Sequence, residues 1–160
     1  FFEEERKNGF PFHHIHAVGK GGWPAMESAL QQRGLNDCPA LDVRQYIYNM
    51  ATVMRGADLV ICRAGASTIS ELTALGMPAI MVPSPYVTNN HQEKNARLLE
   101  AHGGTEVLLE REANGAALYR AAADILRSPD KQARMKQGML SLGIPDATER
   151  IYETVMALVK

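Results

Sequence analysis

A run of four small residues, Gly65-Ala66-Ser67-Thr68, is the first stretch of this sequence whose residue types could do chemistry. It follows a short apolar run, Leu59-Val60-Ile61-Cys62, and the charged residue Arg63. A tight turn of this kind at the start of a helix leaves backbone N–H groups unpaired, and these groups and the helix dipole favour an anionic phosphate. No lysine follows the glycine and there is no G-x-G-x-x-G spacing, so the two common phosphate-binding motifs are excluded. Because most strand-to-helix turns bind nothing, spacing alone leaves phosphate binding and a plain turn equally open.

Glu71 follows this turn and has two interpretations. The segment Thr68-Ile69-Ser70-Glu71 has the S/T-x-x-E spacing of a capping box, in which the glutamate satisfies donors at the helix start. Alternatively, the carboxylate could accept hydrogen bonds from the paired hydroxyl groups of a sugar. The pattern alone favours the capping box, and Ser67 and Thr68 are ambiguous in the same way.

The elements that must position these residues lie between Ala57 and Asn95. The pattern predicts a strand at Leu59–Cys62, a helix from Ser67 that ends at Gly76, a strand at Ala79–Val82, a polar loop at Ser84–Asn90 and a helix from about His91. In a doubly wound sheet, ligands bind beyond the carboxyl ends of the strands. Both loops are therefore expected to open onto one crevice.

The composition argues against a nucleic-acid-binding protein, a disulfide-rich protein and a membrane-spanning protein. The chain has 160 residues, 17 basic and 18 acidic side chains and a net charge of −1, which gives no electrostatic footprint for nucleic acid. Cys38 and Cys62 are too few for a disulfide framework, so a reducing cytoplasm is the simplest location. No apolar run approaches the roughly 18 residues of a membrane span, and the start does not resemble a signal peptide. The chain begins with Phe1 rather than methionine, and we expect a fragment that forms a single domain.

The rest of the chain alternates strands and helices. The other expected strands are Phe10–Val18, Ala40–Val43 and Thr105–Leu109, and the other expected helices are Phe1–Asn8, Pro24–Gln32, Tyr46–Gly56 and three that start near Asn114, Ser128 and Pro145. In the last helix, Ala147, Ile151, Val155 and Leu158 form one apolar stripe. We expect this stripe to pack on the chain's own sheet, and the alternative is that it stays partly uncovered.

Three histidines, His13, His14 and His16, lie close together and raise the question of a metal site. Alternation in a strand places His14 and His16 on one face. No carboxylate or cysteine accompanies them in the sequence, so structural or solvent-facing histidines are favoured over metal ligands. His91 could cap a helix or contact a phosphate, and its role stays open.

Four short patterns in order resemble the donor-nucleotide domain of MurG-type glycosyltransferases. In this chain they are ADLVICRAGA, STISE, GMPAIMVP and HQEKNA, between Ala57 and Ala96. Upstream, IHAVGK and YIYNM resemble two further pieces of the family. The resemblance runs from about Phe12 to Gly104.

The resemblance implies a fold class and an activity. It implies an α/β, Rossmann-like parallel sheet with helices on both faces, the C-terminal half of a GT-B glycosyltransferase. It also implies a donor-binding domain over residues 1–160, with a C-terminal helix at 144–160. The activity would be transfer of N-acetylglucosamine from UDP-N-acetylglucosamine to undecaprenyl-diphospho-N-acetylmuramoyl-pentapeptide in peptidoglycan synthesis, by an inverting and metal-independent displacement.

The resemblance also implies which residues bind the donor. The donor-binding residues would be Ile47 and Met50 at the uracil, Gln92 and Asn95 at the sugar, and Arg63, Gly65, Ala66, Ser67, Thr68, Ile69, Ser70 and Glu71 around the central turn. No cofactor or metal is implied, and the chain has no Asp-x-Asp pair to hold one. The parent enzyme would be a hexosyltransferase at the cytoplasmic face of the plasma membrane, and this chain alone would bind donor without turnover.

Two features of the family are missing from this sequence. Its glycine-rich G-G-S-x-G-A loop and first strand are not found, and neither is an acceptor-binding domain with a general base. In a 3-2-1-4-5-6 sheet the missing strand would be central. We therefore expect the two flanking strands to close on each other or another chain to fill the gap, for example in a homodimer. The alternatives are the donor subunit of a split glycosyltransferase, and an epimerase or non-catalytic Rossmann-like module.

Overall fold

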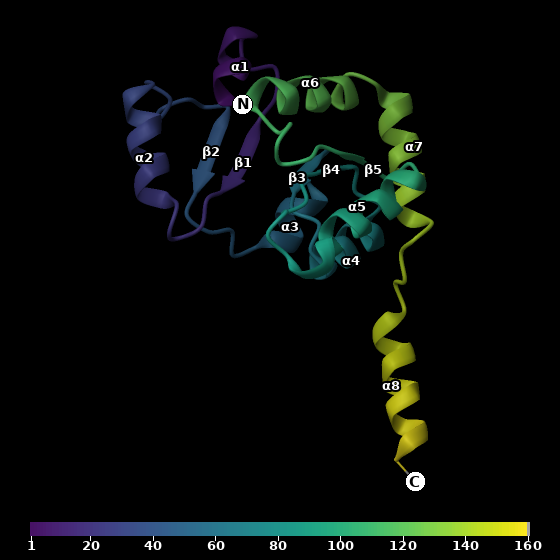
Figure 1. Cartoon of the computed structure of the whole chain (residues 1–160). Coiled ribbons are helices and arrows are strands. Elements are labelled where there is room, and N and C mark those ends of the chain that lie inside the picture. The colour runs from purple at the N-terminus through teal and green to yellow at the C-terminus, as the bar shows by residue number, and fades with distance from the viewer. Residues whose placement is uncertain (160) are drawn as a thin grey trace. The chain divides into compact units, whose positions relative to one another are not determined.

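The computed structural model describes residues 1–159 as an α/β protein with parallel strands (Figure 1). The chain forms two compact units, Phe1–Val53 and Met54–Lys160. Lys160, the last residue of the expected C-terminal helix segment 144–160, lies outside the described residues.

The first unit carries a two-stranded parallel sheet. Its elements are α1 (Phe2–Lys7), β1 (His14–Ala17), α2 (Trp23–Gln32), β2 (Leu41–Arg44) and the start of α3 (Met50–Arg55). The register pairs His14 with Leu41 and Ala17 with Arg44.

Two elements of the first unit begin later in the structure than the sequence predicted. The strand predicted over Phe10–Val18 loses its first half, because Phe10 has a φ of 51° and Pro11 has no N–H group to donate to a sheet. The helix predicted from Tyr46 begins instead at Met50. Its first backbone bonds run from the N–H groups of Thr52 and Val53 to the carbonyl of Asn49, which fixes the later start.

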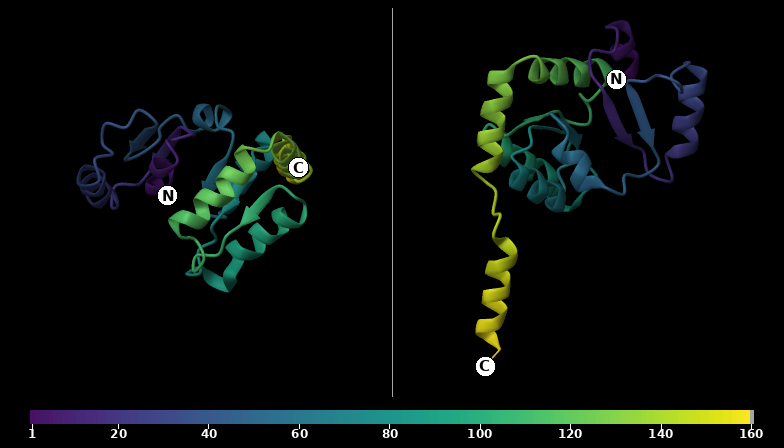
Figure 2. Two further views of the ribbon diagram at one scale, coloured as in Figure 1. Left: turned by 90° about the horizontal axis from the view of Figure 1, so that it is seen from above. Right: turned by 180° about the vertical axis from the view of Figure 1, so that it is seen from behind.

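The second unit carries a three-stranded parallel sheet in the order β3-β4-β5. Its elements are β3 (Val60–Cys62), α4 (Ala66–Leu75), β4 (Ala79–Met81), a 3-10 turn η1 (Thr88–Asn90), α5 (His91–Ala101), β5 (Thr105–Val107), α6 (Gly115–Leu126), α7 (Pro129–Leu140) and α8 (Ala147–Leu158). Figure 2 shows these helices and strands from above and from behind. The predicted start of α6 at Asn114 is confirmed, because Asn114 Oδ1 accepts from the Ala117 N–H (3.0 Å). Ser128, where α7 was predicted to start, is its N-cap, and Ser128 Oγ accepts from the Lys131 N–H (3.3 Å).

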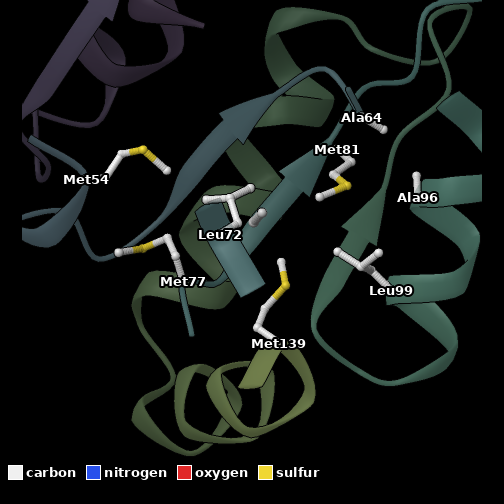
Figure 3. Close-up of a cluster of buried hydrophobic side chains, with 9 residues drawn as sticks. Met54, Ala64, Leu72, Met77, Met81, Ala96, Leu99 and Met139 are labelled. Atoms are coloured by element: carbon white, nitrogen blue, oxygen red, sulfur yellow. The ribbon is translucent and has the colours of Figure 1, made fainter. Parts of the chain in front are cut away.

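The core of the second unit forms around β4. Ala79, Ile80 and Met81 have no exposed surface, and because side chains alternate along a strand, both faces of β4 are covered. Figure 3 shows Leu72 of α4 lying among methionines, with Met139 of α7 pointing toward it. The predicted strand at Ala79–Val82 is thus confirmed as a buried one.

Close backbone approach fixes α7 in this core. A Cβ on Gly138 would lie 2.3 Å from the carbonyl oxygen of His102, so only glycine fits there. At the end of α4, Gly76 adopts a φ of 64°, a left-handed cap that favours glycine, and it lies against the side chain of Leu140. The glycine predicted to end α4 is therefore confirmed, and it also leaves room for α7.

Within residues 1–159 the strands form two sheets, and no strand pair joins them. β1 pairs with β2, and β3 pairs with β4, as short βαβ crossovers favour. Of the two expected outcomes, closure of the flanking strands on each other is not found among residues 1–159. Filling of the gap by another chain stays a prediction. Ile15 of β1 and Ile61 of β3 remain 48% and 41% exposed.

The apolar stripe of α8 does not pack on the sheet, so that expectation is wrong. α8 has no buried residue, and Ile151, Val155 and Leu158 are 65%, 51% and 81% exposed. The physical reason is that other elements already cover both faces of β4. No helix within residues 1–159 has the length and apolar composition to cross a bilayer.

Candidate functional site

The turn after β3 leads directly into α4. Gly65 is the N-cap in an extended conformation (φ −73°, ψ 146°), and the helix begins at Ala66, one residue earlier than predicted. Gly65 has no side chain with which to cap the first turn. The capping-box interpretation of Glu71 is therefore wrong, because Thr68 is the third residue of the helix rather than its N-cap, and the Glu71 carboxylate lies beyond the first turn.

Space beside this turn is open. A Cβ built on Gly65 would meet only the hydroxyl oxygen of Thr68, at 4.0 Å, and Ala66 and Ser67 are exposed. The backbone N–H groups at the start of α4 are orphan donors that a helix leaves for water or a ligand. The turn is thus not filled by its own side chains, and an anion could approach its amides.

The exposed side of α4 carries the polar groups nearest the turn. Ser67 and Glu71 lie four residues apart on one face and are both exposed. Ile69 faces the other way and packs against the core cluster, while Ser70 donates from its hydroxyl to the carbonyl of Ala66 at 3.1 Å. Of the predicted residues on α4, Ser67, Thr68 and Glu71 are therefore available to a ligand, whereas the side chain of Ile69 holds the helix in place.

Gln92 is fixed in orientation by the loop after β4. The backbone N–H of Ser84 donates to Gln92 Oε1 at 2.9 Å. One turn further along α5, Ala96 is fully buried and belongs to the same cluster as Ala64, next to the turn (Figure 3). This face of α5 is therefore turned toward the strand ends, and Gln92 and the half-buried Asn95 lie at its start.

Arg63 spans the carboxyl ends of all three strands in the second unit. It follows β3, and its Nη1 donates to the carbonyl oxygen of Val82, after β4, at 3.0 Å. The same nitrogen contacts a carboxylate oxygen of Glu110, after β5. This hydrogen bond raises the pKa of Arg63 and lowers the pKa of Glu110. Sequence patterns did not reveal Glu110, because it lies in a polar loop without a motif.

Ile47 and Met50, the residues predicted to read a base, belong to the first unit. Ile47 is 6% exposed and lies in the loop before α3, whereas Met50 begins α3 and is 43% exposed. The other predicted donor-binding residues, from Arg63 to Asn95, all belong to the second unit.

The histidines of β1 meet a carboxylate that the sequence did not place there. Glu5 is fully buried, and its Oε1 lies 3.2 Å from Nε2 of His14. Burial, with smaller contributions from His13 and His16, lowers the pKa of His14 to about 4. Within residues 1–159 no group of three or more histidine, cysteine or acidic side chains is arranged to hold a metal ion.

The His91 ring makes a hydrogen bond within the turn that precedes α5. Its Nδ1 lies 2.9 Å from the carbonyl oxygen of Thr88, in the turn that precedes α5. The N-cap of α5 is Asn90, and no side chain accepts a capping hydrogen bond there, so the interpretation of His91 as a helix cap is wrong. Contact with a phosphate stays a prediction.

The fold and this edge of the sheet are typical of α/β proteins that bind a ligand at the carboxyl ends of parallel strands. Parallel α/β sheets bind ligands beyond the carboxyl ends of their strands, and here that edge carries an open turn with helix amides, an exposed carboxylate and an oriented carboxamide. Amides suit a phosphate, and a carboxylate suits paired hydroxyls.

Comparison with known proteins gives the particular family. Residues 2–151 match the glycosyltransferase family 28 C-terminal domain, and the chain belongs to this family. It is 42% identical over 157 residues to the UDP-N-acetylglucosamine–N-acetylmuramyl-(pentapeptide) pyrophosphoryl-undecaprenol N-acetylglucosamine transferase of Acetivibrio thermocellus, covering 98% of this chain and 42% of that protein. A Bacillus cereus enzyme of the same name is 42% identical over 146 residues, covering 91% of this chain and 40% of that protein.

A solved structure agrees with this assignment. The crystal structure of Acinetobacter baumannii MurG matches 89% of this chain and 40% of its own, with a TM-score of 0.74 and 26% identity. The α/β fold is therefore that of the C-terminal half of a GT-B glycosyltransferase. The chain spans about 40% of the length of the relatives it matches.

Proposed function

We propose that this chain is the donor-binding part of an enzyme that transfers N-acetylglucosamine from UDP-N-acetylglucosamine to undecaprenyl-diphospho-N-acetylmuramoyl-pentapeptide. The observation that carries the proposal is 42% identity over nearly the whole chain to an enzyme whose name states the N-acetylglucosamine transfer. The open turn at Gly65 supports it, because a sugar nucleotide needs a place for its diphosphate.

In this proposal the chain stabilises the leaving group. The acceptor hydroxyl attacks the anomeric carbon in one inverting displacement, and UDP leaves with the bonding electron pair. The amides from Gly65 to Thr68 and the dipole of α4 would meet the negative charge that develops on the diphosphate. Arg63 lies nearby as a further cation.

The other residues would read the rest of the donor. We assign the uracil to Ile47 and Met50, paired hydroxyls to Glu71, and the donor sugar to Gln92 and Asn95. Ala66, Thr68, Ile69 and Ser70 would shape the diphosphate turn, with no metal ion taking part. Acceptor binding and the general base are assigned to the length of the relatives that this chain does not cover, so we expect donor binding and no turnover from this chain alone.

We further propose that the sheet of the whole protein contains one more strand. In a 3-2-1-4-5-6 sheet, β1 and β2 correspond to strands 2 and 3, and β3, β4 and β5 correspond to strands 4, 5 and 6. β1 and β3 each keep one edge without a strand neighbour, and a further strand could pair there. Without such a strand, a homodimer could pair these edges. The whole enzyme would act at the cytoplasmic face of the plasma membrane.

Calorimetric titration tests the donor site. The chain is titrated with UDP-N-acetylglucosamine, UDP-glucose and UDP, and we expect UDP-N-acetylglucosamine to bind most tightly. Glu71→Ala should weaken binding of all three about ten-fold, since a carboxylate that accepts hydroxyl hydrogen bonds is lost. Gln92→Ala should weaken only the two sugar nucleotides.

Matched controls come from exposed residues elsewhere in the second unit. Glu149→Ala on α8 and Gln137→Ala on α7 remove the same side-chain types and should bind like the wild type. Equal, weak binding by the wild type, Glu71→Ala and Gln92→Ala would reject the site and favour a non-catalytic module.

A further inference from the structure

We propose that Glu110 is a positioning residue that keeps Gln92 oriented toward the donor sugar, acting through Arg63 and the segment Val82–Ser84. The inference rests on the proposed function, because it takes Gln92 as the residue that reads the sugar. It assigns a role to a residue that no motif singled out.

The first link crosses the strand ends. Arg63 Nη1 donates both to the Val82 carbonyl oxygen, at 3.0 Å, and to the Glu110 carboxylate. One nitrogen therefore ties the residue after β4 to a residue after β5. The carboxylate holds the guanidinium in the position from which it binds Val82, because a charge-assisted bond is stronger and more directional than the bond to the carbonyl.

The second link runs from Val82 to Gln92. Val82 and Ser84 are separated only by Pro83, which is buried and whose ring fixes its φ. A shift of the Val82 carbonyl is therefore passed to the Ser84 N–H, which donates to Gln92 Oε1 at 2.9 Å.

The hydrogen bond from Ser84 fixes which end of the Gln92 carboxamide faces a ligand. A backbone N–H can only donate, so the atom facing Ser84 is the carboxamide oxygen. The amide nitrogen then keeps its two N–H groups for another partner. Gln92 in this orientation offers donors to a sugar hydroxyl oxygen, and a freely rotating carboxamide would offer a mixture of donors and acceptor.

The Arg63–Glu110 pair is poorly placed for a role in stability alone. Its side chains are 51% and 42% exposed, and pairs with that exposure add little to folding. Its geometry instead connects the loops after β3, β4 and β5 at the edge where the donor is expected.

The test compares binding of the nucleotide alone with binding of the sugar nucleotide. The full 160-residue chain and its Glu110→Gln variant are titrated with UDP and with UDP-N-acetylglucosamine. We expect the affinity for UDP-N-acetylglucosamine to fall about three- to five-fold and the affinity for UDP to change less than about two-fold. Glu112→Gln is the matched control, because Glu112 pairs with its neighbour Arg111 and should bind both ligands like the wild type.

A double variant tests whether Glu110 and Gln92 act through the same contacts. When Gln92 is already alanine, adding Glu110→Gln should cause no further loss for the sugar nucleotide, since the two residues act in one chain of contacts. Full additivity, unchanged affinity for UDP-N-acetylglucosamine in Glu110→Gln, or an equal change for UDP would overturn the inference and leave the proposed function standing. A rise in affinity for both ligands would also overturn it, because Glu110 would then be holding Arg63 away from the diphosphate. A wild-type chain that binds neither ligand would reject the proposed function itself.

Discussion

The two sheets of this protein are built from the same βαβ unit but differ in how much they bury. In the three-stranded sheet, β4 has a neighbour on each side and helices over both faces, and its three residues have no exposed surface. In the two-stranded sheet, β1 has one neighbour, and Ile15, His16 and Ala17 are all exposed. A parallel strand needs partners on both edges and cover on both faces before its side chains leave water.

The two units also differ in where they place their charged groups. The second unit places its charged pair, Arg63 and Glu110, at the open edge of the sheet, where both remain half-exposed. The first unit buries a carboxylate, Glu5, beside His14. The first unit thus encloses a carboxylate, whereas the second unit keeps its charged pair at the carboxyl ends of its strands.

The largest predicted effect contrasts two apolar side chains. Leu72→Ala empties a fully buried position, and we expect it to lower the free energy of unfolding by about 3 kcal/mol. Ile15→Ala removes a side chain that is 48% exposed and should cost less than about 1 kcal/mol. Urea unfolding followed by circular dichroism measures both, and similar losses in the two variants would contradict the comparison.

An intermediate effect is expected from a glycine pair. Gly138→Ala places a Cβ against the His102 carbonyl, where the backbone must shift, and should cost about 2 kcal/mol. Gly21→Ala in the first unit meets no atom within 4 Å and should stay within about 0.5 kcal/mol of the wild type. Thermal and urea unfolding test this pair. A Gly138→Ala protein as stable as the wild type would show that α7 is not packed against the loop at His102.

The smallest effect concerns a thiol. Burial raises the pKa of Cys62, on β3, to about 11, so the reactive thiolate becomes scarcer in the folded chain. At pH 8, in a Cys38→Ser background, we expect iodoacetamide to label Cys62 about ten-fold more slowly in the folded chain than in urea. The folded-state rate should rise as pH increases toward 11. Equal rates in the two states would show that the free edge of β3 leaves this thiol in water.

Local patterns predicted the elements well where the chain determines its own conformation. Gly76 ended a helix, Asn114 capped another, a third began just after Ser128, and the apolar run at Ala79–Val82 formed the buried strand. Each of these depends on a few neighbouring residues. The pattern failed at Glu71, where the spacing of a capping box was present but the helix began earlier, at Ala66.

The candidate site was predicted only in part. The open turn at Gly65 and the positions of Glu71 and Gln92 followed from motifs close together in sequence. Glu110 did not, since it meets Arg63 across segments that lie 47 residues apart. Glu5 did not either, since only the path of the chain from α1 into β1 brings it beside His14. The uncovered stripe of α8 was also missed, because amphipathicity identifies an apolar face without saying what covers it.

The sequence by itself determined the order of strands and helices, their caps and the family to which the chain belongs. Only the tertiary structure decided which strands pair, which apolar faces remain exposed and which charges meet at the carboxyl ends of β3, β4 and β5. The reason is physical: caps and periodicity depend on residues within a turn or two, whereas burial and ion pairs depend on surfaces brought together from far along the chain.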